Sequence, residues 1–133
     1  MHYKHVLLID DDFDDQEIFL TAIKRVAASV NCIALDDATS ALQKLLVKDL
    51  APDLIFLDLN MPVMHGQEFL REMKKNEGLK NIPVIIFSTA SHSSTIQRTK
   101  ELGAYDFITK PGKFDELVQV LEPFFKTQHQ PLL

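Results

Sequence analysis

The chain has 133 residues, 46% of them hydrophobic and 25% charged, with a formal net charge of −5 at pH 7. This length predicts one domain with a real core, and the acidic balance argues against a nucleic-acid surface, which needs clustered lysine and arginine. No apolar stretch approaches the roughly 20 residues that cross a bilayer, and the first residues lack a signal-peptide pattern, so we expect a cytoplasmic protein.

Five short apolar runs alternate with segments of helical periodicity, which is the pattern of a parallel sheet wrapped by helices. Several of the runs are apolar on both faces, as central strands of parallel sheets are. The predicted strands cover residues 4–9, 31–35, 53–57, 83–88 and 105–108. The sequence therefore predicts an α/β fold.

The predicted helices fill the gaps between the strands. The first and last have apolar residues at the spacing of one buried stripe; these residues are Phe19, Ala22, Ile23 and Val26 in the first, and Phe114, Leu117, Val118, Leu121, Phe124 and Phe125 in the last. Asp37 or Thr39 can cap the second helix, and the third follows Gly66. The fourth, near residues 94–102, is mostly polar, so we expect it to be loosely held.

Polar residues follow four of the predicted strands. Asp10 and Asp11 come after the first strand, Asp58 after the third and Lys110 after the fifth. In an open parallel sheet, ligands bind beyond the carboxyl ends of the strands. We therefore expect these side chains to meet at one edge. A hydroxyl joins them after the fourth strand, from Ser88 or Thr89, and the pattern leaves this choice open by one position.

Carboxylates this close together raise one another's pKa values unless a cation neutralises them. Hard oxygen ligands without histidine or cysteine favour Mg²⁺. A second interpretation is that the acidic run caps the following helix and complements its dipole. That interpretation accounts for Asp12, Asp14 and Asp15 but not for Asp58. Lys110, taken alone, is more simply an ordinary turn lysine whose charge points to water.

Four motifs in this order and spacing resemble the receiver domain of the two-component response-regulator family, from Val6 to Phe125. The motifs are Leu7–Asp12, Pro52–Pro62 with Gly66, Ile82–Ser88 and Gly103–Pro111. The resemblance implies a flavodoxin-like doubly wound fold, with five parallel strands in order 2-1-3-4-5 flanked by five helices. It also implies a receiver domain over residues 1–126 and a short tail over residues 127–133.

The resemblance assigns the chemistry to particular residues. Asp58 is the expected phosphoacceptor, and Lys110 is expected to bind a phosphoryl oxygen. Asp11, Asp58 and the backbone carbonyl of Asn60 are expected to hold Mg²⁺, with Asp10 acting through a bound water. The Lys110–Pro111 bond is expected to be cis, as is usual in the family.

The resemblance also implies a conformational switch. Ser88, with Thr89 beside it, is the expected hydroxyl that bonds the phosphoryl group, and Phe107 occupies the family's switch-aromatic position. The fourth helix, fifth strand and fifth helix are expected to form a face with two conformations. Phosphorylation is expected to shift the balance between these conformations. Phe107 can also be a plain strand residue.

The expected partners are a histidine kinase or histidine phosphotransfer protein, which donates the phosphoryl group, and an unknown downstream protein. We expect no nucleic-acid or membrane partner, and a monomer or weak homodimer. The chain is expected to be a stand-alone signalling protein, not an enzyme beyond its own phosphorylation and dephosphorylation.

Three other classes of protein fit the sequence less well. A Mg²⁺-dependent phosphatase with an aspartate nucleophile needs a second acid two residues later, where Asn60 stands. A dinucleotide-binding module needs a glycine-rich turn after a strand. The chain has four glycines, and they are too far apart in the sequence to form one. A degenerate receiver that only binds proteins is disfavoured by the intact Asp11, Asp58 and Lys110.

Overall fold

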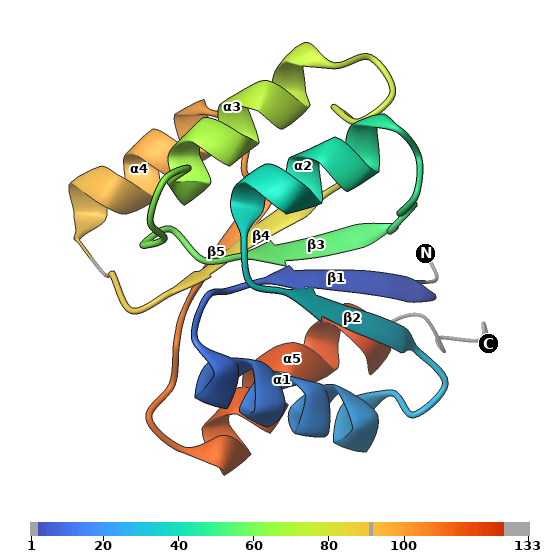
Figure 1. Ribbon diagram of the computed structural model, residues 1–133. Coiled ribbons are helices and arrows are strands. Elements are labelled where there is room, and N and C mark those ends of the chain that lie inside the picture. Colours follow the sequence, from blue (N-terminus) through green and yellow to red (C-terminus); the bar gives the residue numbers. More distant parts are fainter. Residues whose placement is uncertain (1–2, 91, 127–133) are drawn as a thin grey trace, which may run out of the picture.

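A computed structural model describes residues 3–90 and 92–126, and Figure 1 shows its helices and strands alternating along the chain. The elements are β1 (His5–Ile9), α1 (Phe13–Val26), β2 (Asn31–Leu35), α2 (Ala38–Leu46), β3 (Leu54–Leu57), α3 (Gly66–Lys75), β4 (Val84–Ser88), α4 (Ser93–Glu101), β5 (Asp106–Thr109) and α5 (Phe114–Lys126). The tail expected at residues 127–133 lies outside the described residues.

The five strands form one parallel sheet in the order β2-β1-β3-β4-β5. Val6 of β1 pairs with Cys32 of β2 on one side and with Leu54 of β3 on the other. The chain runs outward from β1 to β2, then returns past β1 to β3 and continues to β5. Its winding direction therefore switches between β1 and β3, as in doubly wound folds. The predicted strand order is confirmed.

Two layers of helices cover the sheet. In Figure 1, α1 and α5 lie on one face, and α2, α3 and α4 lie on the other. Successive residues of a strand point to opposite faces. Accordingly, Leu7 and Ile9 pack in the core under α2 and α3, whereas Val6 and Leu8 pack in the core under α1 and α5.

The central strands are buried on both faces, which explains why their sequences are continuous apolar runs. All residues of β3 and β4 are buried, and so are the last four of β1. The edge strands β2 and β5 have no fully buried residue. The acidic residues that follow β1 and β3 are therefore attached to fully packed strands.

Side-chain caps determine where the first two helices begin. The Asp12 carboxylate accepts a hydrogen bond from the Asp15 N–H at 3.0 Å and starts α1. The Asp37 carboxylate accepts one from the Thr39 N–H at 2.9 Å and starts α2. Of the two caps that the sequence left open for α2, Asp37 is therefore the one used.

Helix α4 has the fewest buried residues of the described helices. Thr99 is its buried residue, and Ile96 is half-buried. This agrees with the small apolar surface that its polar sequence predicts. None of the described helices combines the length and the apolar character needed to cross a membrane.

Candidate functional site

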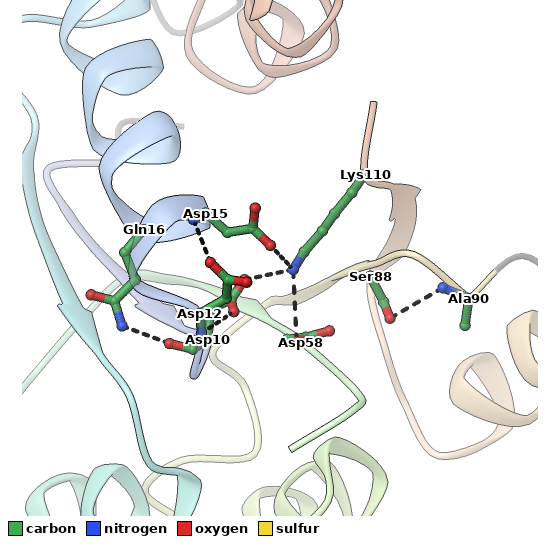
Figure 2. Close-up of polar contacts among 8 residues, drawn as sticks. All are labelled: Asp10, Asp12, Asp15, Gln16, Asp58, Ser88, Ala90 and Lys110. Carbon is green, nitrogen blue, oxygen red and sulfur yellow. Dashed lines mark hydrogen bonds and ion pairs between the residues drawn. The ribbon is translucent and has the colours of Figure 1, made fainter. Parts of the chain in front are cut away.

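The carboxyl ends of β1, β3, β4 and β5 bring the predicted site residues to one edge of the sheet, as Figure 2 shows. The backbone continues the sheet pairing just past the strand ends. The Asp58 N–H donates to the Ile9 carbonyl at 3.0 Å, and the Lys110 N–H donates to the Ser88 carbonyl at 2.8 Å. These bonds hold the first residue after each strand in register with its neighbour.

Asp10, Asp11 and Asp58 form a compact carboxylate group. Each offers an oxygen, and these oxygens all lie within 4.8 Å of one another. Asp10 is fully buried, Asp58 is 6% exposed, and Asp11 is exposed. The group is thus closed to solvent underneath and open on the side of Asp11.

This donor set fits a hard divalent cation. Its ligand atoms are carboxylate oxygens, which suit Mg²⁺. Asp10 Oδ2 is fully buried. Its close neighbour is the ammonium of Lys110, at 2.7 Å in an ion pair. The three carboxylates therefore carry more negative charge than the Lys110 ammonium beside them neutralises.

Burial dominates the ionisation of the two inner carboxyl groups. It raises the pKa of Asp58 above the ordinary value, although the Lys110 ammonium and the Ser88 hydroxyl act in the opposite direction. Burial likewise raises the pKa of Asp10, again against the effect of Lys110. A raised pKa means that the ionised form is unfavourable here, so a bound cation gains from neutralising it.

Lys110 is the cation of the site. Its Nζ lies 2.7 Å from Asp10 Oδ2, 2.8 Å from Asp15 Oδ2 and 3.7 Å from Asp58 Oδ2. Burial alone would lower the pKa of Lys110, but these carboxylates raise it above the ordinary value. Lys110 therefore stays charged, and the interpretation of it as a turn lysine pointing to water is wrong.

The neighbouring polar residues differ in burial. Ser88 is fully buried at the end of β4, whereas Thr89 is exposed. Ser88 is therefore the hydroxyl that faces Asp58, and its Oγ accepts the Ala90 N–H at 3.4 Å. Asn60 is exposed, and Phe107 is half-buried against the core under α2 and α3.

Gly66 allows the start of α3 to lie against the loop that follows β3. A Cβ at this position would lie 2.5 Å from the Asp58 carbonyl oxygen and 2.8 Å from the Leu59 Cα. Both neighbours are backbone atoms, so they cannot move aside as a side chain can. The Gly66 N–H also donates to the Leu59 carbonyl at 3.1 Å. The missing side chain thus helps position the backbone of Asp58.

Sequence reasoning missed two contacts from the first turn of α1. Asp15 accepts a hydrogen bond from Lys110 Nζ, and Gln16 Nε2 donates to the Asp10 carbonyl at 2.6 Å. Asp15 was expected only as a helix-dipole residue. Its place three residues after the cap Asp12 is the signal that it faces back toward the strand ends.

One expectation about the backbone is corrected. No peptide bond among the described residues is cis, so the Lys110–Pro111 bond is trans. Proline only narrows the preference for trans to about 0.5–1 kcal/mol. The isomer therefore depends on the surrounding structure, and here the trans bond accompanies the contacts of Lys110 described above.

The chain is similar to known signalling proteins over nearly its whole length. The family model for the response regulator receiver domain matches residues 6–122. Two-component response regulator ARR6 of Arabidopsis thaliana is 33% identical over 133 residues, which cover 93% of this chain and 70% of that protein. Two-component response regulator ORR1 of Oryza sativa subsp. japonica is 38% identical over 112 residues, covering 80% of this chain and 48% of that protein.

Solved structures agree with these relatives. The phosphorylated cyanobacterial phytochrome response regulator RcpA has a TM-score of 0.82 and 29% identity, covering 93% of this chain and 91% of its own. The Mn²⁺-bound response regulator Rcp1 has a TM-score of 0.82 and 27% identity, covering 98% and 97%. With the matched family model, these likenesses show that the chain belongs to the response regulator receiver domain family.

Proposed function

We propose that the chain is a phosphoacceptor in which Asp58 takes a phosphoryl group from a phosphohistidine of a histidine kinase or phosphotransfer protein. The observation that carries this proposal is the position of Asp58, a buried carboxylate grouped with two others and 3.7 Å from a lysine ammonium. Response regulators are its relatives, and one solved neighbour is described as phosphorylated. The cytoplasmic location remains a prediction.

In the proposed reaction, a carboxylate oxygen of Asp58 attacks the phosphorus atom. A P–O bond forms, the P–N bond of the phosphohistidine breaks, and its electron pair returns to the imidazole, which takes up a proton. Asp58 has to be ionised to attack, so the lysine and a cation that favour its charged form promote the step. Lys110 stabilises negative charge on the phosphoryl oxygens.

Asp11 and Asp58, with the Asn60 carbonyl, are the proposed ligands of Mg²⁺, and Asp10 is proposed to act through water. When bound, Mg²⁺ would neutralise charge shared by the carboxylates and the phosphoryl group. The Mn²⁺-bound neighbour Rcp1 supports this metal role. Asp10 already forms an ion pair with Lys110. This pairing suits a contact of Asp10 with Mg²⁺ through water instead of a direct one.

Ser88 is the proposed sensor of the phosphoryl group. A phosphoryl group adds strong acceptor oxygens beside this buried hydroxyl. We propose that Ser88 moves toward them, that Phe107 follows into the space, and that the face of α4, β5 and α5 changes its surface for a downstream protein. The small buried surface of α4 supports this direction of change, because a weakly packed element shifts at low energetic cost.

Intact mass spectrometry tests the proposal. The protein is incubated with a small phosphodonor and Mg²⁺, in parallel with Asp58→Asn, and with Asp53→Asn as a control aspartate on the opposite edge of the sheet. We expect one added phosphoryl group on the wild type and the control, and none on Asp58→Asn. Equal addition to all three proteins, or to none, would contradict the proposal. Turnover of simple phosphate esters would instead support the phosphatase alternative.

A further inference from the structure

The first turn of α1 competes for the lysine of the site. Lys110 Nζ lies 2.8 Å from Asp15 Oδ2 but 3.7 Å from Asp58 Oδ2. Figure 2 shows the lysine reaching across the strand ends, with dashed contacts to Asp15, Asp10 and Asp58. The ammonium therefore lies closer to Asp15 than to the proposed phosphoacceptor.

The position of Asp15 is determined by its helix. Its backbone N–H donates to the Asp12 carboxylate at 3.0 Å, which fixes the first turn. The next residue, Gln16, donates to the Asp10 carbonyl at 2.6 Å, which ties that turn to the end of β1. These two contacts, one from Asp15 itself and one from Gln16, hold the first turn of α1 over the site. The Asp15 side chain is 36% exposed and that of Lys110 is 11% exposed.

Lys110 has three N–H donors, and three carboxylates surround it. A phosphoryl group on Asp58 carries about −1.5 to −2 charges and three further acceptor oxygens. If Lys110 is to bond them fully, it has to give up or share its hydrogen bond to Asp15. The Lys110–Asp15 pair therefore stabilises the unphosphorylated protein relative to the phosphorylated one.

We propose that Asp15 is a positioning residue that holds Lys110 away from Asp58 and competes with the phosphoryl group for its ammonium. This inference rests on the proposed function. In consequence, the identity of residue 15 sets how favourably Asp58 carries a phosphoryl group. Removing its charge releases Lys110 for the phosphoryl oxygens.

The test measures the affinity for beryllofluoride, a mimic of the phosphoryl group, in the presence of Mg²⁺. Asp15→Asn is compared with Asp14→Asn, which removes the same charge from the neighbouring exposed position. We expect Asp15→Asn to bind beryllofluoride about three- to fivefold more tightly than Asp14→Asn, which is the scale of one partly exposed ion pair. Titrations followed by amide chemical shifts give the dissociation constants.

A double-variant cycle separates a local contact from a general charge effect. In a Lys110→Gln background, Asp15→Asn should bind no more tightly than Asp14→Asn does. If the gain persists without Lys110, or if both asparagine variants bind equally well with Lys110 present, the inference is overturned. Thermal unfolding confirms that each variant is folded, and Asp15→Ser provides a second variant with the same expected gain.

The wild type distinguishes this inference from the proposed function. If the wild type binds beryllofluoride but Asp15→Asn gains nothing over Asp14→Asn, only the role of Asp15 fails. If the wild type does not bind beryllofluoride with Mg²⁺ and takes up no phosphoryl group, the phosphoacceptor proposal fails, and the role of Asp15 falls with it.

Discussion

The edge around Asp58 and the flank formed by α4 and β5 are built differently. At the edge, Asp10 and Ser88 are fully buried, and Lys110 is surrounded by carboxylates. On the flank, Thr99 is the buried residue of α4, and β5 has none fully buried. The chemical groups therefore lie on the tightly packed part of the molecule, and the part proposed to respond to them is weakly packed.

The largest loss of stability is expected for an isoleucine of the core under α1 and α5, compared with an isoleucine on the flank. Ile23→Ala in α1 should lower the free energy of unfolding by about 4 kcal/mol, because Ile23 is buried in a dense core. Ile96→Ala in α4 should lower it by less than about 1 kcal/mol, because Ile96 is only half-buried. Urea denaturation measures both values, and similar losses would erase the contrast in packing.

The next test removes the cation from the edge. Lys110→Met should lower the free energy of unfolding by about 3 kcal/mol without Mg²⁺, because it leaves the buried carboxylates of Asp10 and Asp58 without their ammonium partner. Lys100→Met, at an exposed position of α4, should change it by no more than about 0.5 kcal/mol. Chemical denaturation in the presence of a chelator gives both numbers. Equal effects would mean that the pairing of Lys110 contributes little.

Steric crowding at the edge can be tested with two glycines. Gly66→Ala should cost about 2 kcal/mol, because its Cβ would meet the Asp58 carbonyl at 2.5 Å. Gly112→Ala should be neutral or slightly stabilising, because a Cβ there meets no atom within 4 Å. Thermal unfolding ranks the two variants, and a harmless Gly66→Ala would show that the loop after β3 yields easily.

The smallest expected effect concerns an aspartate that also follows a strand at this edge but lies outside the carboxylate group. The Ser40 hydroxyl lowers the pKa of Asp37, whereas burial raises the pKa of Asp58. The pKa of Asp37 is lower in the folded protein than in the unfolded chain. The ionised carboxylate therefore stabilises the fold fully at pH values above the pKa of the unfolded chain. This stabilisation is lost as the pH falls through the folded pKa.

Asp37→Ala should therefore cost about 1 kcal/mol at pH 7, as the loss of a helix cap does, and less at strongly acidic pH. Asp36→Ala, beside it and exposed, should change little at either pH. Denaturation curves at neutral and acidic pH give the comparison. A cost that stays constant with pH would contradict the role of the ionised carboxylate as the cap.

Much of the fold and part of the site could be predicted from the sequence. Continuous apolar runs marked the buried strands, and the residue after each run reached the expected edge, as Asp58 and Lys110 show. This works because strand ends in a parallel sheet share one edge. The choice of Ser88 over Thr89 needed the structure, because a strand's alternation decides which side chain is buried.

Other features depend on how elements pack together. Asp15 and Lys110 are 95 residues apart in sequence, and their contact depends on how α1 is placed over the sheet. The trans Lys110–Pro111 bond was likewise out of reach, since the intrinsic preference between isomers is only about 0.5–1 kcal/mol. Such features follow from tertiary context, which a local motif does not contain.

We propose that phosphorylation at the edge around Asp58 changes the conformation of the weakly packed flank of α4 and β5. Amide hydrogen exchange, measured with and without phosphorylation at Asp58, tests it most directly. We expect exchange to change in α4 and β5, and the protection of β3 and of α1 beyond its first turn to stay constant. Asp58→Asn should show neither phosphorylation nor any change in exchange. Phosphorylation of Asp58 with no change in α4 and β5 would contradict this proposal.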